Sequence, residues 1–176
     1  MEMDMNIPKW LVIVLSALIV LSVGVSIWAI FFRHTDVGPL APDYAPVKKE
    51  EHAENIENDD DTKMEAEEGG GAVGMIYSDQ VTVDLSEKTA TLFFGNPGKS
   101  LQDMVLQIVI RDEIIVQSGT IVPGKQVRTL DLLPGKEKLL AEGAYDAKFV
   151  AYYYDTETGE RAMLNTEILI TVTVQP

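Results

Sequence analysis

The sequence predicts an all-β fold of seven or eight short antiparallel strands packed as a sandwich, preceded by a single transmembrane helix and a disordered acidic linker. Three observations lead to this prediction. A long uncharged apolar run lies near the N-terminus, a region rich in Asp and Glu follows it, and short apolar runs of period two begin after residue 73. Alternation of apolar and polar residues is typical of half-buried strands, whereas a long apolar run indicates a membrane helix.

The transmembrane prediction rests on residues 10–32, WLVIVLSALIVLSVGVSIWAIFF, which contain no charged side chain. At about 1.5 Å per residue this run forms roughly 35 Å of helix, enough to cross a hydrocarbon core of about 30 Å. Aromatic residues from Trp10 to Phe32 lie near both ends, as membrane interfaces favour. A cleaved signal peptide is the alternative, but its apolar region is about 7–15 residues long. We therefore expect an uncleaved anchor in the lipid bilayer, preceded by a tail of residues 1–9.

The orientation of the anchor follows less directly from the charges around it. Lys9 and Arg33 flank the run on opposite sides, so the excess of basic residues that marks the cytoplasmic side is nearly absent. The short tail and the acidic linker favour a cytoplasmic N-terminus and an extracytoplasmic sandwich; the reversed orientation is the alternative. Ser22 and Ser26 form a small-xxx-small pair that permits self-association of the helix.

Residues 33–72 are predicted to be a disordered stalk. Three prolines come first, and in residues 50–68 ten of nineteen side chains are acidic. Self-repulsion with little apolar surface to bury keeps such a segment extended. Asp59–Asp61 could suggest a Ca²⁺ site, but they lack the alternating ligands and the Gly of a Ca²⁺ loop. We expect no metal site here.

Residues 73–176 are predicted to form the sandwich. Its expected strands cover residues 75–77, 81–85, 89–94, 104–111, 114–117, 127–132, 145–154 and 163–174. Seven or eight strands in about 100 residues fit two packed antiparallel sheets. The parity of the two clearest runs assigns these residues to the core: Met104, Leu106, Ile108, Ile110, Ile168, Ile170, Val172 and Val174.

The stretch AEGAYDA at residues 141–147 resembles the tyrosine corner of immunoglobulin-like domains. Gly143, Tyr145 and Ala147 occupy the positions of that motif, and Ala147 stands where antibody domains carry their second disulfide Cys. The resemblance, over residues 73–176, is to immunoglobulin-like and fibronectin-type-III-like bacterial cell-envelope sandwiches. It implies a Tyr hydroxyl bonded to upstream backbone and a scaffold for adhesion, spacing or protein binding. The chain departs from antibody domains by having no Cys and no core Trp.

The residues needed for catalysis are scarce. The chain contains no Cys, and its two His precede the predicted sandwich. The acids of the domain fall in predicted turns, and no Gly-rich phosphate loop is present. We therefore predict no enzymatic activity and no cofactor. The net charge of −14 also argues against a nucleic acid partner, which basic clusters would bind.

A candidate partner-binding face remains. Val150, Tyr152 and Tyr154 share the outward face of their strand, and Val105 and Val109 extend it if their strand is adjacent. Tyr is favoured at interfaces, although ordinary cross-strand pairing would give the same pattern. The sequence thus predicts a non-catalytic, single-pass binding or structural subunit of a bacterial cell-envelope assembly, with a protein partner. The alternative is an extracytoplasmic sensor that binds a carbohydrate or small ligand on Tyr152 and Tyr154.

Overall fold

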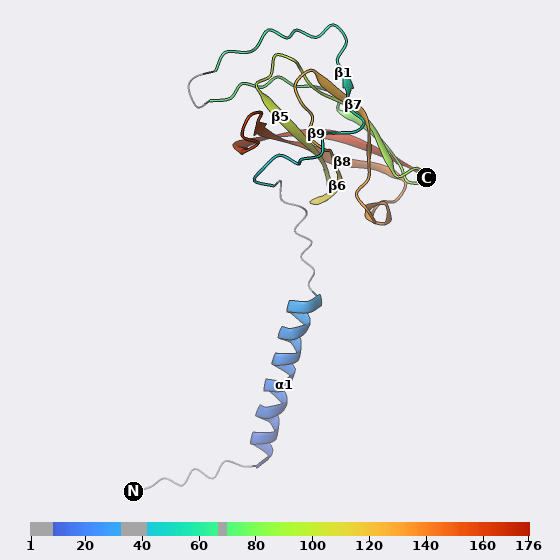
Figure 1. Cartoon of the computed structure of the whole chain (residues 1–176). Helices are drawn as coiled ribbons and strands as arrows, with labels where there is room; N and C mark the ends of the chain where they lie inside the picture. The colour runs from blue at the N-terminus through green and yellow to red at the C-terminus, as the bar shows by residue number, and fades with distance from the viewer. Residues whose placement is uncertain (1–8, 33–41, 67–69) are drawn as a thin grey trace. The chain divides into compact units, whose positions relative to one another are not determined.

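The computed structural model describes residues 9–32, 42–66 and 70–176, which belong to two compact units, Met1–Val37 and Gly38–Pro176 (Figure 1). The first unit contains α1 (Lys9–Phe32), a helix of 24 residues at the place where the sequence predicts one. The predicted tail up to residue 8 and the start of the predicted stalk, residues 33–41, lie outside the described residues.

Apolar side chains of α1 are exposed on every side. Leu18, Ile19, Val20 and Leu21 follow one another, and each is 59–72% exposed. Successive residues point about 100° apart around a helix, so four in a row cover its whole circumference. In the part of the chain that the structure describes, no helix meets the length and hydropathy needed to cross a membrane.

The second unit is all-β, as predicted, but its strands form one mixed sheet of nine strands instead of two separate antiparallel sheets. The strand order is β1-β7-β4-β3-β9-β8-β5-β6, with β2 paired to β4. A short 3₁₀ helix, Lys136–Leu139, precedes β8. The strands are β1 (Glu54–Asn55), β2 (Ile76–Tyr77), β3 (Gln80–Asp84), β4 (Thr89–Asn96), β5 (Gln102–Ile110), β6 (Glu113–Gln117), β7 (Lys125–Asp131), β8 (Gly143–Asp155) and β9 (Arg161–Gln175).

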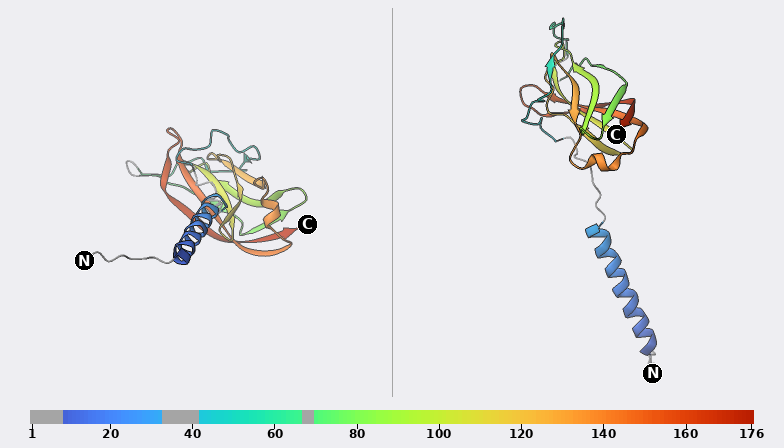
Figure 2. Two further views of the ribbon diagram at one scale, coloured as in Figure 1. Left: turned by 90° about the horizontal axis from the view of Figure 1, so that it is seen from below. Right: turned by 90° about the vertical axis from the view of Figure 1, so that its right-hand side faces the viewer.

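The sheet is continuous because β3 belongs to both of its halves. β3 pairs antiparallel with β4 and parallel with residues 171–175 of β9. At the other end, the Leu133 amide donates to the Ile115 carbonyl at 2.8 Å, and Val116 forms a bridge with Leu132. The sheet therefore curls until β6 meets the end of β7 (Figure 2).

The core fills the inside of this curl, where the two halves of the sheet face each other. Phe94 of β4 meets Phe149 of β8 edge to face, with ring centroids 5.9 Å apart, a favoured arrangement for aromatic pairs. The parity prediction is confirmed for seven of the eight assigned residues, which are buried, while Ile168 is half-buried. Alternation therefore identified the inner face of β5 and β9 correctly.

The predicted disorder of the acidic stalk is wrong for residues 42–66, which we call the strap. The strap runs along the sheet: Tyr44 bridges to Glu160, Lys49 bridges to Thr120, and β1 pairs with β7. Further on, the Asp59 carboxylate accepts from the Gly98 amide. The folded domain thus begins by residue 42 and not at 73. The physical reason is that backbone pairing to an existing sheet edge can order a segment that has little apolar surface of its own.

One charged side chain shows how the strap is held. Glu50 is 8% exposed, and its Oε2 accepts from the Gly119 amide at 2.6 Å while Oε1 accepts from the His52 amide at 3.0 Å. Its neighbour Glu51 is 69% exposed and pairs with exposed Lys48. Hydrogen bonds to charged groups contribute about 1.5–3 kcal/mol, whereas exposed ion pairs contribute about 0–1 kcal/mol.

We expect Glu50→Ala to lower the free energy of unfolding by about 2 kcal/mol because the Gly119 amide loses its charged acceptor. Glu51→Ala, the matched control, should change it by less than about 0.5 kcal/mol. Urea unfolding of both variants measures the difference. Equal, negligible effects would mean that the strap does not contribute to stability.

Candidate functional site

The predicted partner-binding face is not an exposed surface. Val105 and Tyr154 are 0% exposed, Val150 is 4% and Val109 is 8%, and Tyr152 is half-buried. The strands are adjacent as assumed, since β5 pairs with β8 along its whole length. The assumption of an open outer face was wrong, because parity assigns a side chain to a face and does not show whether another segment covers that face.

The strap covers part of this face. The Tyr154 hydroxyl donates to the Pro42 carbonyl at 3.2 Å, and the strap then passes from Glu160 to Thr120, whose hydroxyl donates to the Pro46 carbonyl at 2.8 Å. A second small cluster buries Val109 and Val150, which pack with Ile114, Leu133 and Tyr152. The face is therefore an internal contact of the domain, and the buried Tyr154 ring is not available to stack on a ligand.

Burial beside the strap also shifts the ionisation of two groups on this face. Desolvation raises the pKa of Tyr154 and of its cross-strand partner Asp103. For Asp103 the nearby Lys49 ammonium counteracts the shift, whereas the Asp155 carboxylate adds to it. A carboxyl group with a raised pKa destabilises the folded state when it ionises.

The residues predicted to form a tyrosine corner lie together. The Tyr145 hydroxyl donates to the Ala141 carbonyl at 2.9 Å and accepts from the Ala141 amide at 3.0 Å. Gly143 has φ of 143°, a value that favours glycine, and Ala147 is buried opposite Ile110 of β5. The motif fixes the start of β8 and is structural.

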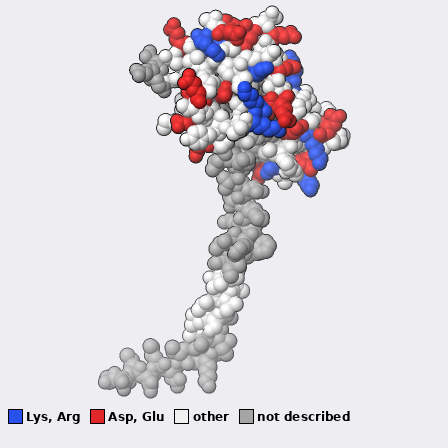
Figure 3. All heavy atoms as spheres, in the orientation of Figure 1, with Lys and Arg blue, Asp and Glu red and all other residues white. Residues whose placement is uncertain are grey.

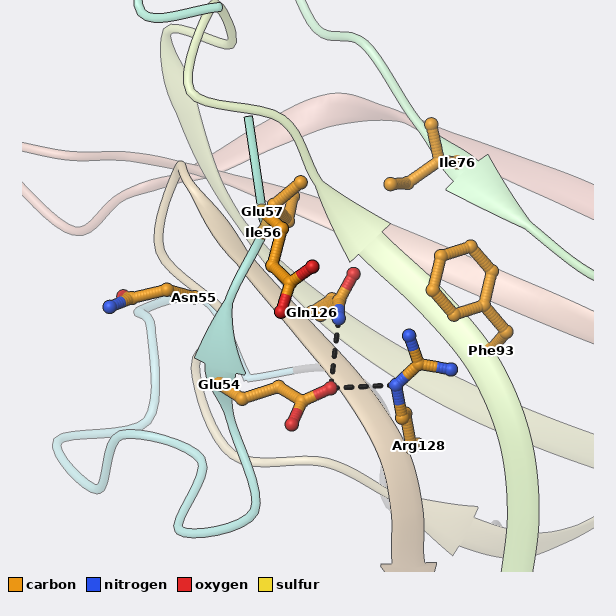
Figure 4. Close-up of a pocket in the computed structure, with 8 residues that line it drawn as sticks. All are labelled: Glu54, Asn55, Ile56, Glu57, Ile76, Phe93, Gln126 and Arg128. Carbon is orange, nitrogen blue, oxygen red and sulfur yellow. Dashed lines mark hydrogen bonds and ion pairs between the residues drawn. The ribbon is translucent and has the colours of Figure 1, made fainter. Parts of the chain in front are cut away.

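The structure contains a hollow of about 480 Å³ that sequence reasoning missed (Figure 4). Its polar wall joins the strap to β7: Glu54 Oε1 accepts from Gln126 Nε2 at 2.8 Å and from Arg128 Nε at 2.7 Å. The Gln126 and Arg128 bonds lower the pKa of Glu54. The Arg128 guanidinium also lies 5.1 Å from the Phe93 ring centroid, as a cation–π pair. These groups bind one another, so we interpret the hollow as part of the joint between the strap and the sheet.

The charged surface of the domain is mixed. On the face shown in Figure 3, Lys and Arg side chains lie among Asp and Glu side chains. Within residues 9–32, 42–66 and 70–176, no group of three or more His, Asp or Glu side chains is placed to hold a metal ion. Some carboxylates of the strap bond to backbone amides, as Asp59 does to Gly98.

One edge of β9 exposes several apolar side chains. Residues 159–161 contact the strap, since the Ala45 amide donates to the Gly159 carbonyl at 2.7 Å and the Arg161 amide to the Asp43 carbonyl at 2.9 Å. Residues 171–175 pair with β3. Between them, residues 163–169, which we call the open edge, have no main-chain partner on this side among the described residues.

Three large apolar side chains of the open edge are exposed: Met163 by 103%, Leu164 by 78% and Leu169 by 85%. Unpaired strand edges with apolar side chains are sites where other strands add. Sequence reasoning identified this strand but could not find the edge, because which strands flank it depends on the topology. The poor alternation of Met163 and Leu164 was the one available signal.

Comparisons with known proteins leave the chain without a family. No family model matches it, and no curated protein matches it significantly. Among solved structures it is similar to AggA, the major subunit of aggregative adherence fimbriae type I from Escherichia coli. That likeness has 12% identity and a TM-score of 0.30, and covers 60% of this chain and 96% of AggA. A likeness this weak carries no argument about function, which has to come from the residues themselves.

The tyrosine corner gives a stability prediction. We expect Tyr145→Phe to lower the free energy of unfolding by about 1 kcal/mol, because it removes both contacts with Ala141. Tyr77→Phe is the control, since Tyr77 is exposed and its hydroxyl makes no hydrogen bond within the described residues. Chemical denaturation of both variants tests this; a Tyr145 variant as stable as the control would contradict it.

The covered carboxyl gives a pH prediction. Because the pKa of Asp103 is raised above its ordinary value of 3.8, its ionisation costs stability as the pH rises through and above that value. Asp103→Asn should therefore raise the melting temperature at pH 7, and the gain should vanish below about pH 3.8.

A second acid, Asp155 at the end of β8, lies opposite the neighbour of Asp103 and should behave in the opposite way. The Thr158 and Glu157 amides bond to Asp155 and lower its pKa below 3.8. Its ionised form stabilises the fold above that value, and this stability is lost as the pH falls through the lowered pKa. Asp155→Asn should thus lower the melting temperature at pH 7 and have less effect in acid. Parallel pH trends for the two variants would contradict the assignment of whichever variant departs from its expected direction.

Proposed function

We propose that this chain is a non-catalytic, single-pass membrane protein that presents its β domain outside the cell membrane, as a binding or structural subunit of a bacterial cell-envelope assembly. The observation that carries the proposal is the helix α1, which is uncharged from Trp10 to Phe32 and exposes apolar side chains on every side.

The apolar surface of α1 supports a membrane anchor. Its 24 residues extend over about 36 Å. Leaving apolar surface in water costs about 25 cal/mol per Å², and a helix that is apolar all round has no polar face to turn toward solvent. In the hydrocarbon of a lipid bilayer, apolar side chains on every side of the helix are in a favourable environment.

The domain supports a binding or structural role more than a catalytic one. Burial raises the pKa of Asp103 and of Tyr154, and both groups lie beside the strap. The Lys49 ammonium counteracts the shift of Asp103, and the Tyr154 hydroxyl donates to the Pro42 carbonyl. Other shifted carboxyls, such as Asp84 and Asp155, have a lowered pKa because neighbouring amides bond to them in turns. Acid–base catalysis needs groups held near the working pH in a place that substrate can reach.

The topology is also compatible with an immunoglobulin-like sandwich. β3 pairs with both halves of the curl, the halves face each other across Phe94 and Phe149, and Tyr145 fixes the start of β8. Domains of this kind are used as scaffolds for binding and spacing, although the fold alone implies no one function.

Membrane fractionation of the full chain tests the anchor. We expect the wild-type chain to stay with membranes after alkaline carbonate extraction, and Leu18→Arg/Leu21→Arg to be extracted. Each charge at the centre of a membrane helix costs about 2.5–3.5 kcal/mol on the insertion scale. The matched control is Leu18→Ala/Leu21→Ala, which should stay in the membrane.

The same preparations test the orientation. Protease added to intact spheroplasts should release the β domain if it lies outside, and should do so only after lysis if it lies inside. Extraction of the wild-type chain by carbonate would overturn the anchor, whereas protection of the domain would overturn only its placement outside the membrane.

A further inference from the structure

The strap is held to the β domain by polar contacts. Among the described residues, the buried apolar side chains of the core all lie outside the strap. Of the strap's own apolar residues, Tyr44 and Val47 are exposed, while Ala53 and Ile56 are half-buried. Segments with few buried apolar contacts open at a lower free-energy cost than the core does. The strap therefore has the composition of an element that can separate from the sheet.

The surface under the strap is held in place by bonds in which the strap takes no part. Asn96 Nδ2 donates to the Ile121 carbonyl at 3.0 Å, and the Asn96 carbonyl accepts from the Gly124 amide at 2.7 Å. The Ser118 hydroxyl accepts from the Leu106 amide at 2.9 Å. On its other edge, β7 pairs with β4. This surface can thus keep its form when the strap is away.

The strap binds this surface repeatedly through one kind of group. Three of its carboxylates accept hydrogen bonds from backbone amides or from side chains of β7. Figure 4 shows the middle one, with Glu54 facing Gln126 and Arg128. We call the donor groups the seat. The pairs are Glu50 with Gly119, Glu54 with Gln126 and Arg128, and Asp59 with Gly98.

The chain that follows the strap is attached in a different way. Val73 and Met75 are half-buried and pack against the core, and Ile76 of β2 pairs with Gly95 of β4. Apolar packing and sheet pairing thus begin just beyond the strap. A separation that starts at Pro42 consequently has a natural end near residue 72.

We propose that the strap is a detachable ligand of the seat, which leaves and rebinds as one unit while the rest of the β domain stays folded. When it is detached, the roughly 30 residues from Pro42 to Ala72 form a tether with a contour length of about 100 Å. The empty seat then fits an extended segment whose carboxylates have the spacing of Glu50, Glu54 and Asp59. A longer reach from the membrane rests on the proposed anchor, whereas detachment itself does not.

Hydrogen exchange of the full chain in detergent micelles, followed by mass spectrometry, tests detachment. Three strap amides report on it, because each donates to a carbonyl outside the strap. We expect them to exchange about 100-fold faster than the amides of β5 and β8, after correction for intrinsic rates. The three pairs are the Glu50 amide with the Thr120 carbonyl, the Ile56 amide with Gly124 and the Met64 amide with Lys99.

A disulfide lock tests whether the strap leaves as one unit. Asn55 and Lys125 lie directly opposite each other in β1 and β7, and the chain has no cysteine of its own. Opposite residues of antiparallel strands are about 4.5–5.5 Å apart between Cα atoms, within disulfide range. In oxidised Asn55→Cys/Lys125→Cys, all three reporter amides should exchange roughly tenfold more slowly or less, and reduction should restore the rates.

A variant that weakens the strap is the counterpart of the lock. Glu50→Ala removes the acceptor of the Gly119 amide and leaves the groups of the seat in place. It should speed the exchange of all three reporter amides by about tenfold or more, without changing β5.

A fluorescent peptide of residues 42–66 tests the seat. The peptide should bind the full-length Glu50→Ala chain, whose own strap competes poorly, and should bind the oxidised, locked chain roughly tenfold more weakly or less. A peptide with the same residues in shuffled order controls for charge and should not bind. Fluorescence anisotropy measures both.

Exchange of the strap at the rate of β5 and β8 would show that it opens only with the whole domain, and strap amides without protection would show that it is not bound. Either result overturns the proposal. A lock that slows only the amides beside residue 55 would overturn the single unit. Equal binding of the two peptides, or binding of neither, would overturn the seat. Extraction of the chain by carbonate would overturn the anchor and leave these results unchanged.

Discussion

The structure of the β domain depends on the position of one short strand. β3 forms an antiparallel ladder with β4 and a parallel ladder with the end of β9, and it thereby joins the two halves of the sheet around a single core. Because β3 ends its pairing at residue 171 of β9, it also determines where the edge of β9 is covered and where it is open. The closed core and the exposed edge are consequences of the same five-residue strand.

Local patterns predicted the features that depend on neighbouring residues. Alternation identified the buried positions of β5, such as Leu106 and Ile108, and the Gly-x-Tyr pattern located the contact between Tyr145 and Ala141. Features that depend on distant parts of the chain were missed. Nothing near Tyr154 shows that Pro42 will cover it, and nothing near Glu54 shows that Arg128 will bind it. The acidic strap was misjudged for this reason: its partners lie in other segments.

The domain covers some of its sheet edges with the strap and leaves another edge exposed. The strap pairs with β7 through Glu54 and Asn55 and contacts the tip of the β8–β9 hairpin, so these edges are protected by the chain itself. The open edge of β9 lacks such a cover and carries Met163, Leu164 and Leu169. Strand edges that stay unpaired and apolar favour association with other strands.

The strap also has a consequence for biosynthesis. It leaves the ribosome before the segments that it contacts, since Glu50 and Pro42 bond to residues 69 and 112 positions later. Contacts so distant in sequence form late in folding. The nascent strap must therefore wait until these later segments have been made, and its contacts with the hairpin of β8 and β9 are completed last. A segment with so many carboxylates remains hydrated and resists aggregation during that interval, so the composition that resembles disorder also protects an element whose binding site has not yet been translated.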